Sequence, residues 1–155
     1  MTENNYISVK SYTHLTGLSE RTIRRYIANH DIDFLVGKDK RVMIAMTELK
    51  NNSIIAFNTD VLDLIKQADT GEAAAQNDVA LLFLDSQHAD MAFYWLNIAA
   101  KQHCSDAMQL LGECYVKGLG VKKDRNQAIS WLAKAATAGS QIASQQMDGI
   151  LLNRH

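Results

Sequence analysis

Residues 107–139 read AMQLLGECYVKGLGVKKDRNQAISWLAKAATAG, and this stretch decides the fold of the larger part of the chain. On each side of its glycine-containing loop, alanines and large apolar residues recur three and four positions apart, the spacing of one helix face. Asp124 follows the loop where a helix N-cap is favoured. The stretch therefore predicts two antiparallel helices that approach closely at their alanines.

The same pattern occurs a second time. Residues 92–100 match residues 128–136, and residues 75–83 match residues 107–115, in residue type as well as in hydrophobicity. A third copy starts at Gly139 and runs through one helix. Each helix pair would expose an apolar face until the next pair stacks on it, so the pattern predicts an α/α solenoid of about two and a half repeats over residues 58–155. The alternative is an unrelated helical bundle whose apolar stripe mimics a repeat.

Residues 107–139 resemble the Sel1-like repeat, a relative of the tetratricopeptide repeat. The matching elements are Ala107, Leu111-Gly112, Tyr115, Gly118-x-Gly120-Val121, Asp124, Ala128, Trp131, Ala135-Ala136 and Gly139. Residues 71–103 match less well, because they lack the glycine loop and have His103 at the terminal glycine position. The resemblance implies a protein-interaction scaffold, a class that is not usually catalytic. Trp95 and Trp131 occupy equivalent repeat positions, and we expect them in the core and not as ligand-stacking groups.

The first part of the chain follows a different pattern. Residues 8–15 predict a short helix, residues 16–18 a tight turn, and Ser19 the N-cap of a second helix that ends near Asn29 in the left-handed conformation. At 100° per residue, the cations of the second helix share one face and its apolar residues lie opposite. The cationic face consists of Arg21, Arg24 and Arg25. A helix, a glycine-containing turn and a basic second helix are typical of a helix-turn-helix.

Residues 34–44 predict a β-hairpin with a charged tip, and residues 47–49 the start of a further helix. A basic hairpin beside a basic helix is a wing, so the helix would enter a DNA major groove while the hairpin neutralises phosphates. Residues 6–49 resemble the winged helix-turn-helix of excisionases and MerR-type regulators, through Tyr6-Ile7-Ser8-Val9, Thr16-Gly17-Leu18-Ser19 and Arg21-Thr22-Ile23-Arg24-Arg25-Tyr26. The long dimerising helix of full MerR regulators has no counterpart here.

The DNA-binding hypothesis predicts contacts with double-stranded DNA from the second helix, its N-cap and the hairpin tip. The candidate residues are Ser19, Arg21, Thr22, Arg24, Arg25, Lys38, Lys40 and Arg41. Two alternatives are that the three arginines form a solvated helix face, or that the fold binds protein instead of DNA.

Composition and charge bound the remaining classes. The chain has 155 residues, 47% hydrophobic and 21% charged, with no proline, which excludes collagen-like and low-complexity proteins. It has no apolar run of about 18 residues, its start lacks the features of an export signal, and we expect Cys104 and Cys114 to be reduced thiols in the cytoplasm. Residues 1–57 carry eight Lys/Arg against six Asp/Glu, and residues 58–155 eight against eleven. A local basic patch on an acidic body fits a nucleic-acid-binding head.

Catalytic and metal-binding patterns are weak. Gly118-x-Gly120 lacks the third glycine of a nucleotide-binding motif, and the five histidines form no ligand pair at helical spacing. Ten residues along one helix would separate the Cys104 and Cys114 thiols by about 15 Å, too far to share an ion. We therefore expect no enzymatic activity, no metal and no cofactor.

The sequence thus predicts a mainly α protein with a small winged helix-turn-helix over residues 1–57 followed by the repeats. The first hypothesis is a DNA-binding transcriptional regulator or recombination accessory factor whose repeats bind a protein partner or a second copy. The alternative is a non-enzymatic adaptor in which both parts bind protein. Because fewer than three full repeats are marginal alone, we expect the head to cap the array near Val61, Leu64 and Ile65. At the other end, Ile150, Leu151 and Leu152 are expected to pack inward or to pair in a homodimer.

Overall fold

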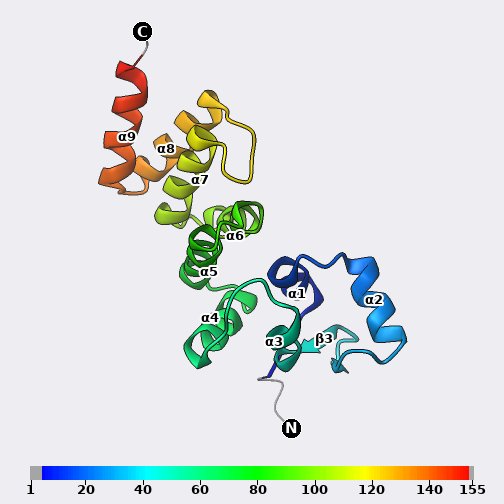
Figure 1. The fold of residues 1–155 in the computed structure, drawn as a ribbon. Helices are drawn as coiled ribbons and strands as arrows, with labels where there is room; N and C mark the ends of the chain where they lie inside the picture. Colours follow the sequence, from blue (N-terminus) through cyan, green and yellow to red (C-terminus); the bar gives the residue numbers. More distant parts are fainter. Residues whose placement is uncertain (1–4, 154–155) are drawn as a thin grey trace. The chain divides into compact units, whose positions relative to one another are not determined.

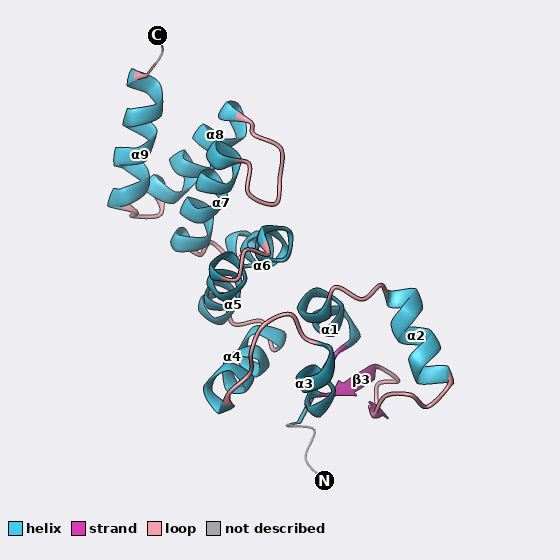
Figure 2. Ribbon diagram, viewed as in Figure 1, coloured by secondary structure: helices cyan, strands magenta, loops and turns pink. Residues whose placement is uncertain are grey.

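The computed structural model describes residues 5–153. The chain divides into two compact units, residues 1–70 and 71–155, and each is considered by itself (Figure 1). Within the described residues, strands occur only in the first unit (Figure 2). No helix in this part of the chain combines the length and the apolar character needed to cross a bilayer. The expectation about an export signal rests largely on residues 1–4, which lie outside the described range.

The first unit combines short helices with a three-stranded antiparallel sheet in the order β1-β3-β2. Two short helices joined by a turn, and a hairpin of β2 and β3, lie where the sequence predicts them, whereas the sequence does not predict β1, which pairs with β3. The elements are β1 (Tyr6–Ser8), α1 (Val9–Thr16), α2 (Glu20–Ala28), β2 (Phe34–Val36), β3 (Val42–Ala45), a 3-10 turn (Met46–Glu48), α3 (Leu49–Asn52) and α4 (Thr59–Asp69).

Local hydrogen bonds explain where the first two helices begin and end. Ser8 and Ser19 are the N-caps of α1 and α2, and each hydroxyl accepts a bond from the amide three residues later. Gly17 ends α1 in the left-handed conformation, with φ 74°. The expectation for Asn29 is wrong, because it is right-handed and the next residue, His30, has φ 58°. The imidazole of His30 stacks on Phe34, with ring centroids 6.0 Å apart.

The core of the first unit lies between the helices and one face of the sheet. The largest fully buried side chains of β1, α1, α2, β3 and α3 are Ile7, Tyr12, Leu15, Ile23, Ile44 and Leu49. Only Ile23 is buried among the nine residues of α2, so this helix presents most of its surface to solvent. The Tyr12 hydroxyl accepts a hydrogen bond from Asn52 Nδ2 at 3.1 Å, which joins α1 to α3.

The helix α4 belongs to the first unit, although the expected boundary placed residues 58 onward with the repeats. The side chain of Asp69, the last residue of α4, accepts hydrogen bonds from Ser8 at the end of β1. Ser8 Oγ donates to Asp69 Oδ1 at 2.6 Å, and the Ser8 amide donates to Asp69 Oδ2 at 3.1 Å. The same Ser8 hydroxyl caps α1. One aspartate therefore ties the end of α4 to the junction of β1 and α1.

Asp69→Ala should destabilise the first unit by about 1.5–3 kcal/mol, the usual loss for hydrogen bonds to a charged group. Hydrogen-exchange mass spectrometry should show faster exchange in β1 and α1. The control is Asp63→Ala on the same helix, whose exposed pair with Lys66 at 3.8 Å should contribute less than about 1 kcal/mol. Equal exchange in the two variants would contradict this role for Asp69.

The second unit is a stack of antiparallel helices, α5 (Ala73–Asp85), α6 (Ala89–Lys101), α7 (Ser105–Lys117), α8 (Arg125–Thr137) and α9 (Gln141–Leu152). The helices pack as α5 on α6 and α7 on α8, and α6 on α7 and α8 on α9 join the pairs. Buried alanines mark the close approaches: Ala92, Ala99, Ala128, Ala135 and Ala143. The predicted stacking of helix pairs is confirmed for α5–α6 and α7–α8, and α9 follows them as a single helix.

Two glycines explain features of the second repeat. A Cβ at Gly112 would lie 2.6 Å from Leu132 Cγ, so α7 and α8 are close enough to require glycine. Gly120 has φ 67°, and a Cβ there would collide with the backbone of Ala89 at the start of α6. The loop between α7 and α8 therefore rests on the preceding repeat.

Trp95 and Trp131 differ, although their repeat positions are equivalent. Trp95 is 1% exposed and lies in the core. Trp131 is only half-buried, and the Lys134 ammonium lies 4.2 Å from its ring centroid. The expectation of a core position therefore holds for Trp95 and only in part for Trp131.

Candidate interaction surfaces

The cations predicted on α2 are exposed, but they differ in the groups that they contact. Arg24 Nη2 lies 3.4 Å from Glu20 Oε2, in a pair whose side chains are 76% and 57% exposed. The Arg25 guanidinium lies over the Tyr26 ring, 5.7 Å from its centroid. Arg21 is exposed, whereas Ser19 and Thr22 are occupied with each other, since their hydroxyls lie 2.9 Å apart in the cap.

The hairpin tip is also charged and exposed. Gly37 N donates to Arg41 O at 2.8 Å and Lys40 N to Gly37 O at 2.9 Å, with Lys40 in the left-handed region at φ 64°. Arg41 donates from both its backbone amide and its guanidinium to Asp39. These bonds lower the pKa of Asp39 below its ordinary value. The Asp39 carboxylate thereby offsets the charge of Arg41, while Lys38 remains exposed at the tip.

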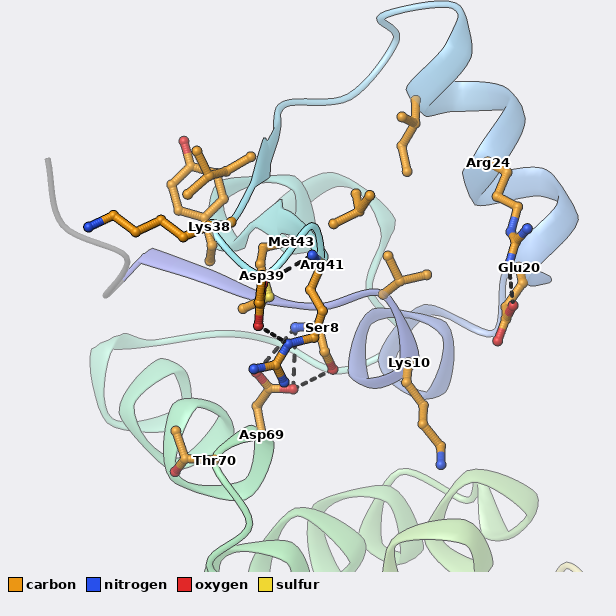
Figure 3. A pocket seen from close by; sticks show the side chains of 16 residues that line it. Ser8, Lys10, Glu20, Arg24, Lys38, Asp39, Arg41, Met43, Asp69 and Thr70 are labelled. Carbon is orange, nitrogen blue, oxygen red and sulfur yellow. Dashed lines mark hydrogen bonds and ion pairs between the residues drawn. The ribbon is translucent and has the colours of Figure 1, made fainter.

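A groove of about 1080 Å³ lies between α2, the sheet and the end of α4 (Figure 3). It brings together Arg24 of α2 with Lys38 and Arg41 of the hairpin, but the Lys38 side chain extends away from Arg24. The other candidate DNA contacts do not line this groove; they are Ser19, Arg21, Thr22, Arg25 and Lys40. Sequence reasoning missed Tyr6, Met43 and Asp69 at this site, because only the pairing of β1 with β3 and the packing of α4 bring them there.

A smaller cavity of about 280 Å³ lies on the repeats between α7 and α9. Glu113 of α7 lines this cavity and is hydrogen-bonded to α9. Gln146 Nε2 of α9 donates to Glu113 Oε1 at 2.7 Å, and Lys117 Nζ lies 3.1 Å from Glu113 Oε2. Gln109 also donates to Glu113. Three apolar side chains also line this cavity, Val116, Leu132 and Ile150.

The hydrogen bonds to Glu113 lower its pKa. Burial alone would raise it, but the bonds from Gln146, Lys117 and Gln109 outweigh burial, so the pKa lies below its ordinary value of 4.5. Because the folded pKa is lowered, the ionised carboxylate stabilises the fold above pH 4.5, and this contribution disappears as the pH falls through the folded pKa.

We expect Glu113→Gln to be less stable than the natural chain at about pH 7, and the difference to shrink toward about pH 3. Urea unfolding followed by tryptophan fluorescence would measure it, since both tryptophans belong to the second unit. Asp90→Asn at exposed α6 is the control for general acid effects. A difference that stays constant with pH would show that ionised Glu113 does not hold α7 to α9.

The residues expected to mediate self-association lie at the end of α9. Leu151 and Leu152 are 36% and 77% exposed, so Leu152 does not pack inward and Leu151 is covered only in part. Ile150 is half-buried in the small cavity, and its carbonyl accepts a bond from Arg125. Ile142, at the start of the same helix, is also exposed at 59%.

The cysteines and acidic groups do not assemble a metal site among residues 5–153, where no group of three potential ligands comes together. Cys104 is half-buried, and Cys114 is buried inside α7. Burial raises the pKa of the Cys114 thiol to about 11. A thiol with this pKa is protonated near neutral pH and is a weak nucleophile.

The repeats have relatives of known name. The chain is 34% identical over 91 residues to DAP3-binding cell death enhancer 1 of Rattus norvegicus and 34% identical over 89 residues to the Mus musculus protein of the same name. Each match covers 56% of this chain but only 18% of the relative, so the chain spans less than a fifth of the curated relatives it matches.

Solved structures match the same architecture. The Sel1 repeat protein from Oxalobacter formigenes superposes with a TM-score of 0.54 at 34% identity, covering 56% of this chain and 26% of that one. The protein c5321, a protective antigen of uropathogenic Escherichia coli with an SLR fold, gives 0.56 at 28% identity, covering 68% and 24%. The family description of the Sel1 repeat matches residues 73–104 and 105–140. The chain therefore contains two Sel1 repeats, formed by α5 with α6 and by α7 with α8.

Proposed function

We propose that this chain is a non-enzymatic adaptor whose Sel1 repeats bind a protein partner. The observation that carries the proposal is the surface between α7 and α9, where an apolar cavity adjoins the Glu113–Lys117 ion pair. Val116 beside this cavity is 42% exposed, so it can contact an apolar side chain of a partner. The relative named as DAP3-binding supports a protein-binding role for such repeats.

Site-specific photo-crosslinking in the native cell tests this function. A benzoylphenylalanine at position 116 or 150 should capture a discrete protein, and the same group at exposed Thr137 of α8 should not. The captured protein, purified, should bind the full chain in calorimetry and lose about tenfold or more in affinity to Ile150→Glu. Equal capture from positions 116 and 137 would reject the repeat surface as the binding site.

Binding of double-stranded DNA is a second candidate, and the exposure of Arg21 and Arg25 on α2 favours it. Both guanidinium groups are clear of carboxylates in the described structure, unlike Arg24 and Arg41. The modest positive charge of the first part means that affinity would depend on few phosphate contacts, so the total affinity would be modest and the slope of log affinity against log salt would be shallow.

Arg21→Ala/Arg25→Ala should weaken binding to a random 20-base-pair duplex and reduce the slope of log affinity against log salt by about two units. The control is Lys50→Ala on α3, an exposed cation outside the predicted contacts. If the double variant keeps full affinity, or the natural chain fails to bind at low salt, the DNA function is excluded and the adaptor function stands alone.

A further inference from the structure

The groove of the first unit has an apolar floor that the chain itself leaves open. Met43 lies between Ser8 and Leu35 across the sheet, and Met43 and Leu35 are both half-buried. On the opposite face, Ile7 and Ile44 have no exposed surface. Successive residues of a strand face opposite sides, so one face of this sheet builds the core and the other floors the groove.

The walls add further apolar surface. Ile27 of α2 lines one side, and Tyr6, which lies on the same face of the sheet as Met43, lines another; both are half-buried. A duplex phosphate offers nothing that would gain by contact with these side chains. An aliphatic or aromatic side chain does, at roughly 25 cal/mol for each Å² of apolar surface removed from water.

The charged residues that line the groove determine which charge an apolar ligand should carry. Four cations and three carboxylates line the groove, and all three carboxylates already have partners: Glu20 pairs with Arg24, Asp39 with Arg41, and Asp69 accepts from Ser8. The two arginine pairs are well exposed, so each is held weakly and its guanidinium can exchange one carboxylate for another. Arg24 stands on the α2 side and Arg41 on the hairpin side (Figure 3).

We propose that this groove binds an extended acidic peptide of a partner protein, with apolar side chains on the sheet floor and flanking carboxylates at Arg24 and at Arg41 or Lys38. A volume of about 1080 Å³ is enough for several side chains. The inference rests on the proposed adaptor function and assigns the first unit a protein ligand of its own. It makes the groove, and not the exposed Arg21 and Arg25 of α2, the recognition surface of this unit.

Fluorescence anisotropy with the full chain tests the proposal. The probe is a labelled seven-residue peptide in which leucine and phenylalanine alternate with glutamate, and its counterpart has lysine at each glutamate. The acidic probe should bind saturably, and the lysine probe at least about tenfold more weakly. Met43→Glu on the floor and Ile27→Glu on the α2 wall should each weaken the acidic probe by about tenfold or more.

The matched control is Val36→Glu, which places the same charge on β2 at a residue that is 55% exposed and does not line the groove. Circular dichroism confirms that each variant is folded, and two groove variants from different elements allow one to fail this check. Unchanged affinity in the folded groove variants would overturn the proposal, as would equal binding of both probes or no binding at millimolar protein.

Two further outcomes separate this proposal from the functions above. If a 20-base-pair duplex displaces the acidic probe, and Met43→Glu also abolishes duplex binding, the groove is a DNA-binding site. That result would overturn the peptide assignment. Failure of the probe while photo-crosslinking still captures a partner at position 116 would reject the groove alone and leave the repeats as the protein-binding part.

Discussion

Gly120→Ala is expected to destabilise the second unit by about 3 kcal/mol or more. An alanine at φ 67° costs roughly 1–2 kcal/mol, because the left-handed region crowds its Cβ. The new Cβ would also collide with the carbonyl group of Ala89 and the amide nitrogen of Asp90, which are backbone atoms fixed in the first turn of α6. Overpacking of this kind typically adds 1–3 kcal/mol. Thermal unfolding followed by tryptophan fluorescence should show a midpoint lower by roughly 12–24 °C.

The sequence offers a matched control in Gly139. It also has a positive φ, 101°, but a Cβ there meets no atom within 4 Å. Gly139→Ala should therefore show the conformational cost alone, about 1–2 kcal/mol. If both variants lose the same stability, the loop between α7 and α8 does not rest on α6.

Trp95→Ala is expected to cost about 3–5 kcal/mol, the range for removing a large aromatic side chain from a packed core. Trp95 is 1% exposed and ranks among the largest fully buried side chains of the chain, with Tyr94 in edge-on contact at 5.4 Å between centroids. The cavity left behind would separate α6 from its neighbours in the stack. Urea unfolding measured by far-ultraviolet circular dichroism gives the loss without relying on the deleted fluorophore.

The equivalent change in the next repeat should be much milder. Trp131 is half-buried, and Lys134 above its ring supplies a contact worth about 0.5–1 kcal/mol at an exposed site. Trp131→Ala should therefore cost less than half as much as Trp95→Ala. Similar losses would mean that the two positions are energetically equivalent, as their repeat positions alone suggest.

The sequence was sufficient for the repeats because their physics is local. Alanines three and four positions from large apolar residues define a helix face, and the Gly118-x-Gly120 loop marks the turn between helices. The pattern could not distinguish Trp95 from Trp131, since burial depends on which helices cover each ring. It also assigned α4 to the repeats, because nothing near Asp69 in the sequence reveals its bonds to Ser8.

The first unit was predictable in its elements but less so in its surface. The caps at Ser8 and Ser19 and the hairpin turn follow from residue preferences over a few positions. Charge counting identified the arginines of α2 and the cations of the hairpin but not their partners. The bonds of Arg24 to Glu20 and of Arg41 to Asp39 depend on side-chain geometry, and the open sheet floor at Met43 depends on strand register.

The hydrogen bond that the Ser8 amide donates to Asp69 has a consequence for how this protein avoids self-assembly. The strand β1 stands at the margin of its sheet, where unused amides can recruit a strand from another molecule and seed aggregates. A charged group already occupies the Ser8 donor, and an incoming chain would have to expel it. Removal of the Asp69 side chain would therefore leave the Ser8 amide of this edge strand unpaired, in addition to weakening the attachment of α4. The Asp69→Ala variant should form oligomers whose size increases with protein concentration.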